Sequence, residues 1–145
     1  MSDQQEDDSL AQWEEFFERN KKEGKEYFLV QNFYSKDNFH FSDSNTKCTA
    51  KDAMQYVSLL DKEDFSSGVT FSNNKYTFIK KFEYSSKENL PLYFFLSKEE
   101  VVGDDKERVS LIVKFITDEV IFIGKCLNSK KTTAINFVGK NYNYY

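Results

Sequence analysis

Apolar side chains near the N-terminus recur at the spacing of an amphipathic helix. In the stretch SLAQWEEFFERN, Leu10, Trp13 and Phe17 fall on one face, Phe16 sits at the edge of that stripe, and glutamates point the other way. Ser9 precedes the stripe and can act as its N-cap. The pattern therefore predicts a short helix that starts at Ser9.

This helix has two interpretations. An apolar stripe at helical spacing is usually packed against a core. The alternative is that Trp13 and Phe16 stay partly exposed, as a flat aromatic platform on which an extended ligand stacks. The helix pattern alone leaves both interpretations open.

After Gly24, which suits a helix C-terminus, the apolar pattern shifts to the alternation of strands. The links between the predicted strands are short and rich in Ser, Asn and Asp, which favours an antiparallel meander. The link KEEVVGDDKE is the longest and is expected to be a mobile connection. The predicted strands cover residues 25–33, 37–42, 69–71, 75–84, 90–96, 108–117 and 119–125.

Two further helices are predicted. Thr49 can cap a helix over residues 50–62, and residues 129–145 match a helical stripe better than a strand pattern, although a terminal strand is the alternative. Residues 1–8 are acidic and poor in apolar groups, which predicts a disordered lead-in. The expected fold is α+β: an antiparallel sheet of six or seven strands, flanked by N- and C-terminal helices, with a helix after the second strand.

The charge is unevenly distributed along the 145 residues. Residues 1–24 hold eight acidic and three basic residues, a net charge of −5, so residues 25–145 hold 16 acidic and 17 basic residues, a net charge of +1. From Val120 onward there are four lysines and no acidic residue. These lysines could meet an acidic partner or lipid head groups, or simply form a solvated face.

The sequence offers little for catalysis. Cys48 and Cys126 are far apart and lack metal-ligand spacing, which predicts free thiols in a reducing compartment, and His40 stands alone. No phosphate-binding glycine loop or cofactor fingerprint is present. We therefore expect no enzyme, cofactor or metal. The chain lacks an apolar run of membrane-spanning length and a secretory leader, so an intracellular, cytoplasmic location is expected.

The order of several short motifs resembles that of profilin, the family of small actin-monomer-binding proteins. Trp13, Phe16 and Gly24 stand where that family has a tryptophan, an aromatic residue and a glycine ending the first helix. FLVQ and NFHF resemble its first two strands, GVTFSNNKYTFI resembles its glycine-led hairpin, and VIFIGK followed by a lysine pair resembles its last strand and the start of its C-terminal helix. The resemblance spans residues 9–145, which implies one domain.

The resemblance implies a monomeric cytoskeletal protein that regulates actin filament assembly, without a nucleic-acid partner. In profilins an aromatic groove between the terminal helices binds proline-rich segments, a lysine-containing opposite face binds monomeric actin, and basic patches bind phosphoinositides. The groove residues carried over are Trp13, Phe16, Phe39, Tyr142, Tyr144 and Tyr145. The actin-binding residues carried over are Phe65, Ser66, Lys80, Lys98, Ser110, Lys125 and Asn128. The phosphoinositide-binding residues carried over are Lys80, Lys81, Lys125, Lys130 and Lys131.

This chain departs from the profilin pattern at two groove positions. Phe39 stands where the family usually has a second tryptophan, and Phe16 also lacks a hydrogen-bonding group. Each lost hydrogen bond is worth on the order of 1 kcal/mol, so weaker binding of proline-rich peptides is expected. The alternatives are a sensory domain of the PAS type with a small ligand, an actin-depolymerising domain, for which a long basic helix is missing, and an enzyme.

Overall fold

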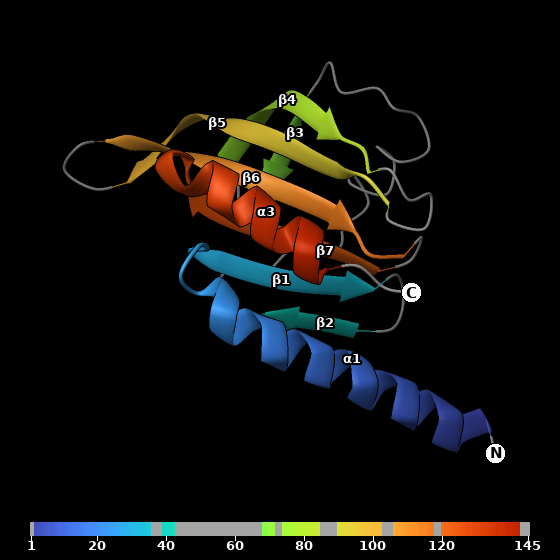
Figure 1. The fold of residues 1–145 in the computed structure, drawn as a ribbon. Helices are drawn as coiled ribbons and strands as arrows, with labels where there is room; N and C mark the ends of the chain where they lie inside the picture. Colours follow the sequence, from blue (N-terminus) through green and yellow to red (C-terminus); the bar gives the residue numbers. More distant parts are fainter. Residues whose placement is uncertain are drawn as a thin grey trace.

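The computed structural model describes residues 2–35, 39–42, 68–71, 74–84, 90–102, 106–117 and 120–142. This part of the chain folds as an α+β unit in which two α-helices accompany a seven-stranded sheet (Figure 1). The helices are α1 (Ser2–Gly24) and α3 (Lys131–Asn141), with a 3-10 turn η1 (Asn128–Lys130) before α3. The strands are β1 (Val30–Ser35), β2 (Phe39–Ser42), β3 (Val69–Phe71), β4 (Asn74–Phe82), β5 (Leu92–Val102), β6 (Glu107–Phe115) and β7 (Val120–Leu127).

All neighbouring strands are antiparallel, in the order β2-β1-β7-β6-β5-β4-β3. The predicted meander is confirmed for β4 to β7, which follow one another across the sheet. The β1–β2 hairpin lies beside β7, so the beginning and the end of the chain meet in the sheet. The predicted antiparallel sheet of six or seven strands is confirmed, and it is visibly curled in Figure 1.

The N-terminal helix begins earlier than the sequence predicts. Because α1 starts at Ser2, Ser9 lies inside it and the predicted N-cap at Ser9 is wrong. Residues 2–8, predicted as a disordered lead-in, belong to the helix. Acidic residues are favoured near the positive N-terminal end of a helix dipole, so the composition that predicted disorder also suits the first turns of a helix. The predicted end at Gly24 is confirmed, and the Phe28 amide donates to the Gly24 carbonyl.

Two predicted strand boundaries need correction. The first strand starts at Val30 rather than at residue 25, because residues 25–27 form turns on the end of α1. The link KEEVVGDDKE is mostly strand, since β5 continues to Val102 and β6 starts at Glu107. Ser97 stabilises this hairpin: its hydroxyl accepts from the Val109 amide and its carbonyl accepts from the Arg108 guanidinium. The polar composition of the link concealed this continuation of the two strands.

Alternate residues of the central strands point to opposite faces of the sheet and form a buried hydrophobic cluster on each face. We call the cluster beneath α1 and α3 the helix-side core and the cluster on the other face the far-side core. α1 contacts β1 and β2, and α3 contacts β6 and β7. The helix-side core contains Phe17, Phe28, Phe33, Leu92, Phe94, Ile112, Ile116, Val120, Phe122, Cys126, Ala134, Phe137, Val138 and Tyr142. The far-side core contains Val30, Val69, Phe71, Tyr76, Tyr93, Phe95, Val109, Leu111, Val113, Phe115, Ile121 and Ile123.

The C-terminal segment is helical, so the alternative of a terminal strand is wrong. α3 buries Ala134, Phe137 and Val138 against the sheet. Gly139, an unfavourable helix residue, has a packing role here: a Cβ at this position would come within 3.0 Å of the Tyr84 hydroxyl oxygen. The predicted helix over residues 50–62 and its cap Thr49 lie outside the described residues.

Candidate functional site

Aromatic rings from the two terminal helices meet beside β1. The ring centroids of Trp13 and Phe16 are 5.9 Å apart, and those of Phe16 and Tyr142 are 6.0 Å apart, both with edge-on geometry. We call these three residues the aromatic row. Successive rings at such spacings and edge-on angles form favourable aromatic pairs. The structure thus brings together three of the residues predicted for a proline-binding groove.

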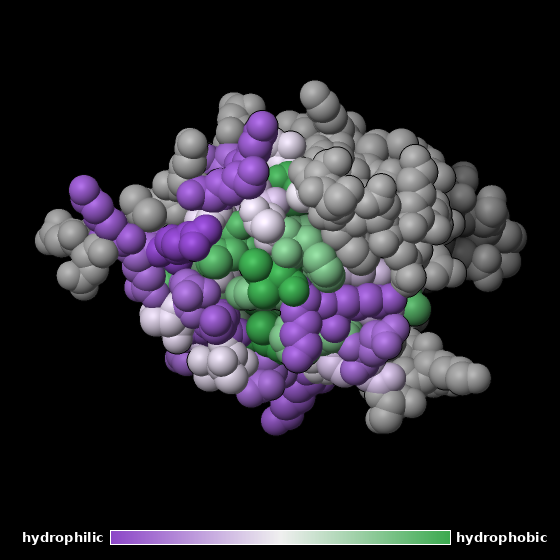
Figure 2. Space-filling model, turned by 90° about the horizontal axis from the view of Figure 1, so that it is seen from above, coloured by the Kyte–Doolittle hydropathy of each residue, from purple (hydrophilic) through white to green (hydrophobic). Residues whose placement is uncertain are grey.

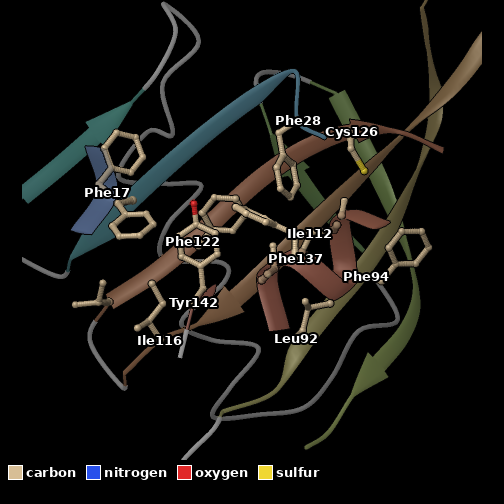
Figure 3. Close-up of a cluster of buried hydrophobic side chains, with 14 residues drawn as sticks. Phe17, Phe28, Leu92, Phe94, Ile112, Ile116, Phe122, Cys126, Phe137 and Tyr142 are labelled. Carbon is tan, nitrogen blue, oxygen red and sulfur yellow. The ribbon is translucent and has the colours of Figure 1, made fainter. Parts of the chain in front are cut away.

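Members of the aromatic row differ in exposure. Trp13 and Phe16 are partly exposed, whereas the next residue, Phe17, is buried in the helix-side core. Tyr142 is fully buried, and its ring stacks on that of Phe122 with the centroids 4.4 Å apart. Figure 3 shows these two side chains within the buried cluster. Phe17 therefore belongs to the core, whereas Trp13 and Phe16 pack against that core and stay partly exposed. Tyr142 supports this partly exposed aromatic surface from beneath.

The other predicted groove residues are less informative. Phe39 lies in β2 opposite Ser35. Its side chain and all of Tyr144 and Tyr145 lie outside the described part of the structure. Arg19 adds a feature that the sequence argument missed, because its guanidinium carbon stands 5.7 Å from the Phe16 ring centroid. The spacing of three residues along α1 is the signal that could have revealed this contact.

A second candidate surface lies where β4 and β5 meet the start of α3. Lys80 and Lys131 are exposed, and their ammonium nitrogens stand 4.9 Å from the Phe82 centroid and 5.9 Å from the Phe94 centroid respectively. Lys80 is also the register partner of Phe94 across β4 and β5. Lys98 is exposed farther along β5. We call Lys80, Lys98 and Lys131, with the rings beneath two of them, the basic face.

Polar groups next to the basic face are already paired. The Ser110 hydroxyl donates to Asn128 Oδ1 at 3.1 Å, so two residues carried over for actin binding are in contact. Ser110 is fully buried. The Glu107 carboxylate accepts from the Ser129 amide. Hydrogen bonds with the Ser129 side chain and with its backbone amide hold the pKa of Glu107 below its ordinary value. The Glu107 carboxylate is therefore already engaged by the start of η1.

Apolar surface is also present on this side of the molecule. Figure 2 looks onto the molecule from the β3–β4 side and shows apolar side chains in the middle of the view, with hydrophilic side chains around them. Ile79 of β4 is 51% exposed. It lies at a bulge, where the register between β4 and β5 shifts between Phe78 and Lys80. The bulge explains why an apolar side chain faces solvent within a strand.

The remaining lysines carried over do not join the basic face. Lys125 is only 7% exposed and lies opposite Leu111 and Val30, which belong to the far-side core. Lys81 contacts the Glu83 carboxylate at 3.3 Å. Lys130 donates to the Glu26 carbonyl at 3.1 Å. The five lysines predicted for phosphoinositides are therefore dispersed. Phe65 and Ser66 lie outside the described residues.

The sequence argument missed a buried lysine. Lys114 of β6 has no exposed surface, and burial lowers its pKa to about 8. Its ammonium nitrogen stands 5.5 Å from the centroid of the Tyr84 ring. The buried Tyr84 hydroxyl has no hydrogen-bond partner among the described residues, and burial raises the pKa of Tyr84 to about 12. The signal was visible in the sequence, because Lys114 is the only charged residue in the run VSLIVKFI.

The described residues offer no obvious reactive centre. Cys126 is buried, and burial raises its pKa to about 12, which keeps the thiol protonated and unreactive. No group of three or more His, Cys, Asp or Glu side chains gathers as a metal site within the described ranges. Cys48 and the His40 side chain lie outside them. None of the helices described is long and apolar enough to cross a membrane.

The fold and its two surfaces define an α+β domain built on a curled antiparallel sheet with terminal helices. Comparison with family models, with curated proteins and with solved structures gave no match.

Proposed function

We propose that this protein is a profilin-like binding module that engages proline-rich segments and monomeric actin on separate surfaces and thereby regulates filament assembly. One observation carries the proposal: the aromatic row and the basic face lie toward opposite edges of the sheet. α1 contacts the β1–β2 edge, whereas Lys80 lies on β4, near the other edge. Both partners could therefore be bound together. The architecture and the sequence motifs are compatible with the profilin fold.

The aromatic row suits a proline-rich ligand on physical grounds. A polyproline II helix is extended before it binds, so it loses little conformational entropy on docking, and flat rings fit against its ridges. Trp13 and Phe16 offer such partly exposed rings. Tyr142 packs between Phe16 and Phe122 and so connects the exposed rings to the core. The aromatic surface is thus held by a rigid core, which lowers the entropy cost of binding.

The basic face suits an acidic protein surface such as that of actin. Lys80 and Lys131 hold their charges above the rings of Phe82 and Phe94, and Lys98 extends the positive charge along β5. Complementary charge speeds encounter and fixes the register of a complex. The same two lysines, Lys80 and Lys131, are the part of the phosphoinositide set that could contact a head group together. This role places the protein in the cytoplasm, with the cytoskeleton.

Proline-rich binding is tested by titrating Trp13 fluorescence with a proline-rich peptide. We expect a saturable change in emission, because a ligand on the aromatic row alters the surroundings of the indole. Measured by calorimetry, Trp13→Ala should lose on the order of 2 kcal/mol of binding free energy, roughly a thirtyfold weaker Kd. Phe78→Ala, on a partly buried ring next to the far-side core, is the matched control and should leave the Kd unchanged. Equal affinity of the Trp13→Ala variant would refute this site.

Actin binding is tested by charge reversal on the basic face. Lys80→Glu and Lys131→Glu should each weaken binding of monomeric actin by about tenfold or more, because like charges then oppose the acidic partner. Lys22→Glu changes an exposed lysine on α1 and is the matched control. The measurement is a sedimentation or thermophoresis titration at two salt concentrations. Equal effects of all three variants would show that only net charge matters, and would count against a specific face.

A further inference from the structure

Lys114 is a buried lysine for which the described part of the chain provides no counter-ion. Its Nζ donates to the Phe115 carbonyl at 2.8 Å and stands near the Tyr84 ring. Within the described residues it has no ion pair and no second hydrogen bond. An ammonium group carries three donors, so two remain unused in a site without exposed surface. Burying a charge in this way is costly unless the group becomes neutral.

The lysine lies beneath the C-terminal half of α3. Its register partners are Leu92 of β5 and Phe122 of β7, and Phe122 carries the stacked ring of Tyr142. Tyr84 connects Lys114 to α3 on the other side, because its ring packs against Gly139. The phenols of Tyr84 and Tyr142 are the titratable groups that these elements contribute.

Other charged groups on the neighbouring elements point elsewhere. Lys80 of β4 stands over Phe82, and Lys131 at the start of α3 stands over Phe94. Lys140, in the last turn of α3, is exposed. No carboxylate in the described residues pairs with Lys114. The charge state of the Lys114 amine is therefore set by burial and by solvent pH.

We propose that Lys114 makes the packing of α3 on the sheet pH-sensitive, so that protonation of its amine favours a state in which the C-terminal half of α3 has moved off the sheet. The neutral amine fits the closed arrangement. The ammonium is better hydrated when α3 opens and water reaches it. Opening also separates Tyr142 from Phe122, the contact that supports the aromatic row.

The size of the effect follows from linkage. With a pKa of about 8 in the closed state and the ordinary 10.5 when hydrated, the opening equilibrium should be about tenfold smaller at about pH 9 than at about pH 7. If the aromatic row binds proline-rich segments, their affinity should rise over the same interval. That second consequence rests on the proposed function, whereas the opening of α3 does not.

The test is hydrogen exchange of α3 amides by mass spectrometry at about pH 7 and about pH 9, corrected for the intrinsic exchange rate. In the native chain, we expect the corrected opening of α3 to fall about tenfold with rising pH. Lys114→Met keeps the buried stem and removes the charge, so its corrected opening should not change with pH. Lys140→Met, which removes an exposed lysine from the same helix, should behave as the native chain does.

Lys114→Arg provides a second, opposite variant, because arginine stays charged throughout this range. It should leave α3 open to exchange at both pH values. A native chain without pH dependence in α3, or a Lys114→Met variant that retains it, would overturn the proposal. Unchanged peptide binding alongside the expected exchange pattern would count against the proline-binding role alone.

Discussion

Replacing Tyr142 with alanine should destabilise the protein by about 3–5 kcal/mol, the usual cost of truncating a buried aromatic residue. Tyr142 has no exposed surface, and its ring packs against the aromatic rings of Phe16, Phe33, Phe122 and Phe137. Two of these contacts, with Phe33 and Phe122, reach the sheet, one with Phe16 reaches α1, and one with Phe137 lies on α3. Loss of one ring therefore weakens the packing of both helices at once. Urea unfolding followed by circular dichroism measures the change.

Two control variants sharpen this prediction. Tyr142→Phe keeps the ring and removes only the hydroxyl, so it should lose far less stability than Tyr142→Ala. Tyr27→Ala removes a partly buried tyrosine that contacts Phe137 at the rim of the same cluster, and it should cost less as well. A decrease in unfolding free energy below about 1 kcal/mol for Tyr142→Ala would mean that this ring does not stabilise the packing of the helices on the sheet.

Strand positions were predictable because buried strands appear in the sequence as apolar or alternating runs bounded by turn-forming residues. The strand over residues 69–71 was predicted with its observed bounds, and those of β4 and β7 differ by one or two residues. The continuation of β5 and β6 into their connecting link was missed, because the acidic residues there resemble a loop and the stabilising groups, Ser97 and Arg108, act through side-chain hydrogen bonds. Composition does not encode such contacts. The pairing of β1 with β7 joins strands that are far apart in the sequence, so the lengths of the links between neighbouring strands could not predict it.

The candidate surfaces were predictable in part. Helical spacing placed Trp13 and Phe16 together, but it could not tell that the ring of Tyr142 lies beneath them, because burial depends on how α3 meets the sheet. Strand parity gives a further lesson. Lys80 and Lys81 are adjacent, so they point to opposite faces of β4, and a single basic patch containing both was unfavourable from the start.

Lys114 shows the limit of sequence patterns most clearly. A lysine in an apolar strand could extend its ammonium group to solvent, and only the packed structure shows that it does not. The domain therefore holds an ionisable amine in its interior. Such groups are costly to keep, so their removal is often stabilising.

Lys114→Met should therefore be more stable than the native chain near neutral pH, and the gap should close as pH rises. The folded state lowers the pKa of Lys114 from 10.5 to about 8, so between these values the unfolded chain binds more protons and the stability of the native chain rises with pH. The gap between the two proteins should narrow by about 2 kcal/mol from about pH 7 to about pH 9.5.

Other buried groups shift both proteins alike and cancel in this comparison. Burial raises the pKa of Cys126 from 9.0 to about 12 and that of Tyr84 from 10.0 to about 12. Each group then binds more protons when folded, so stability falls above its ordinary pKa. The native chain should consequently be most stable in alkaline solution, at about pH 9 to 10. Urea titrations across this range measure the gap directly, and a gap that stays constant would show that the Lys114 amine is hydrated in the folded protein.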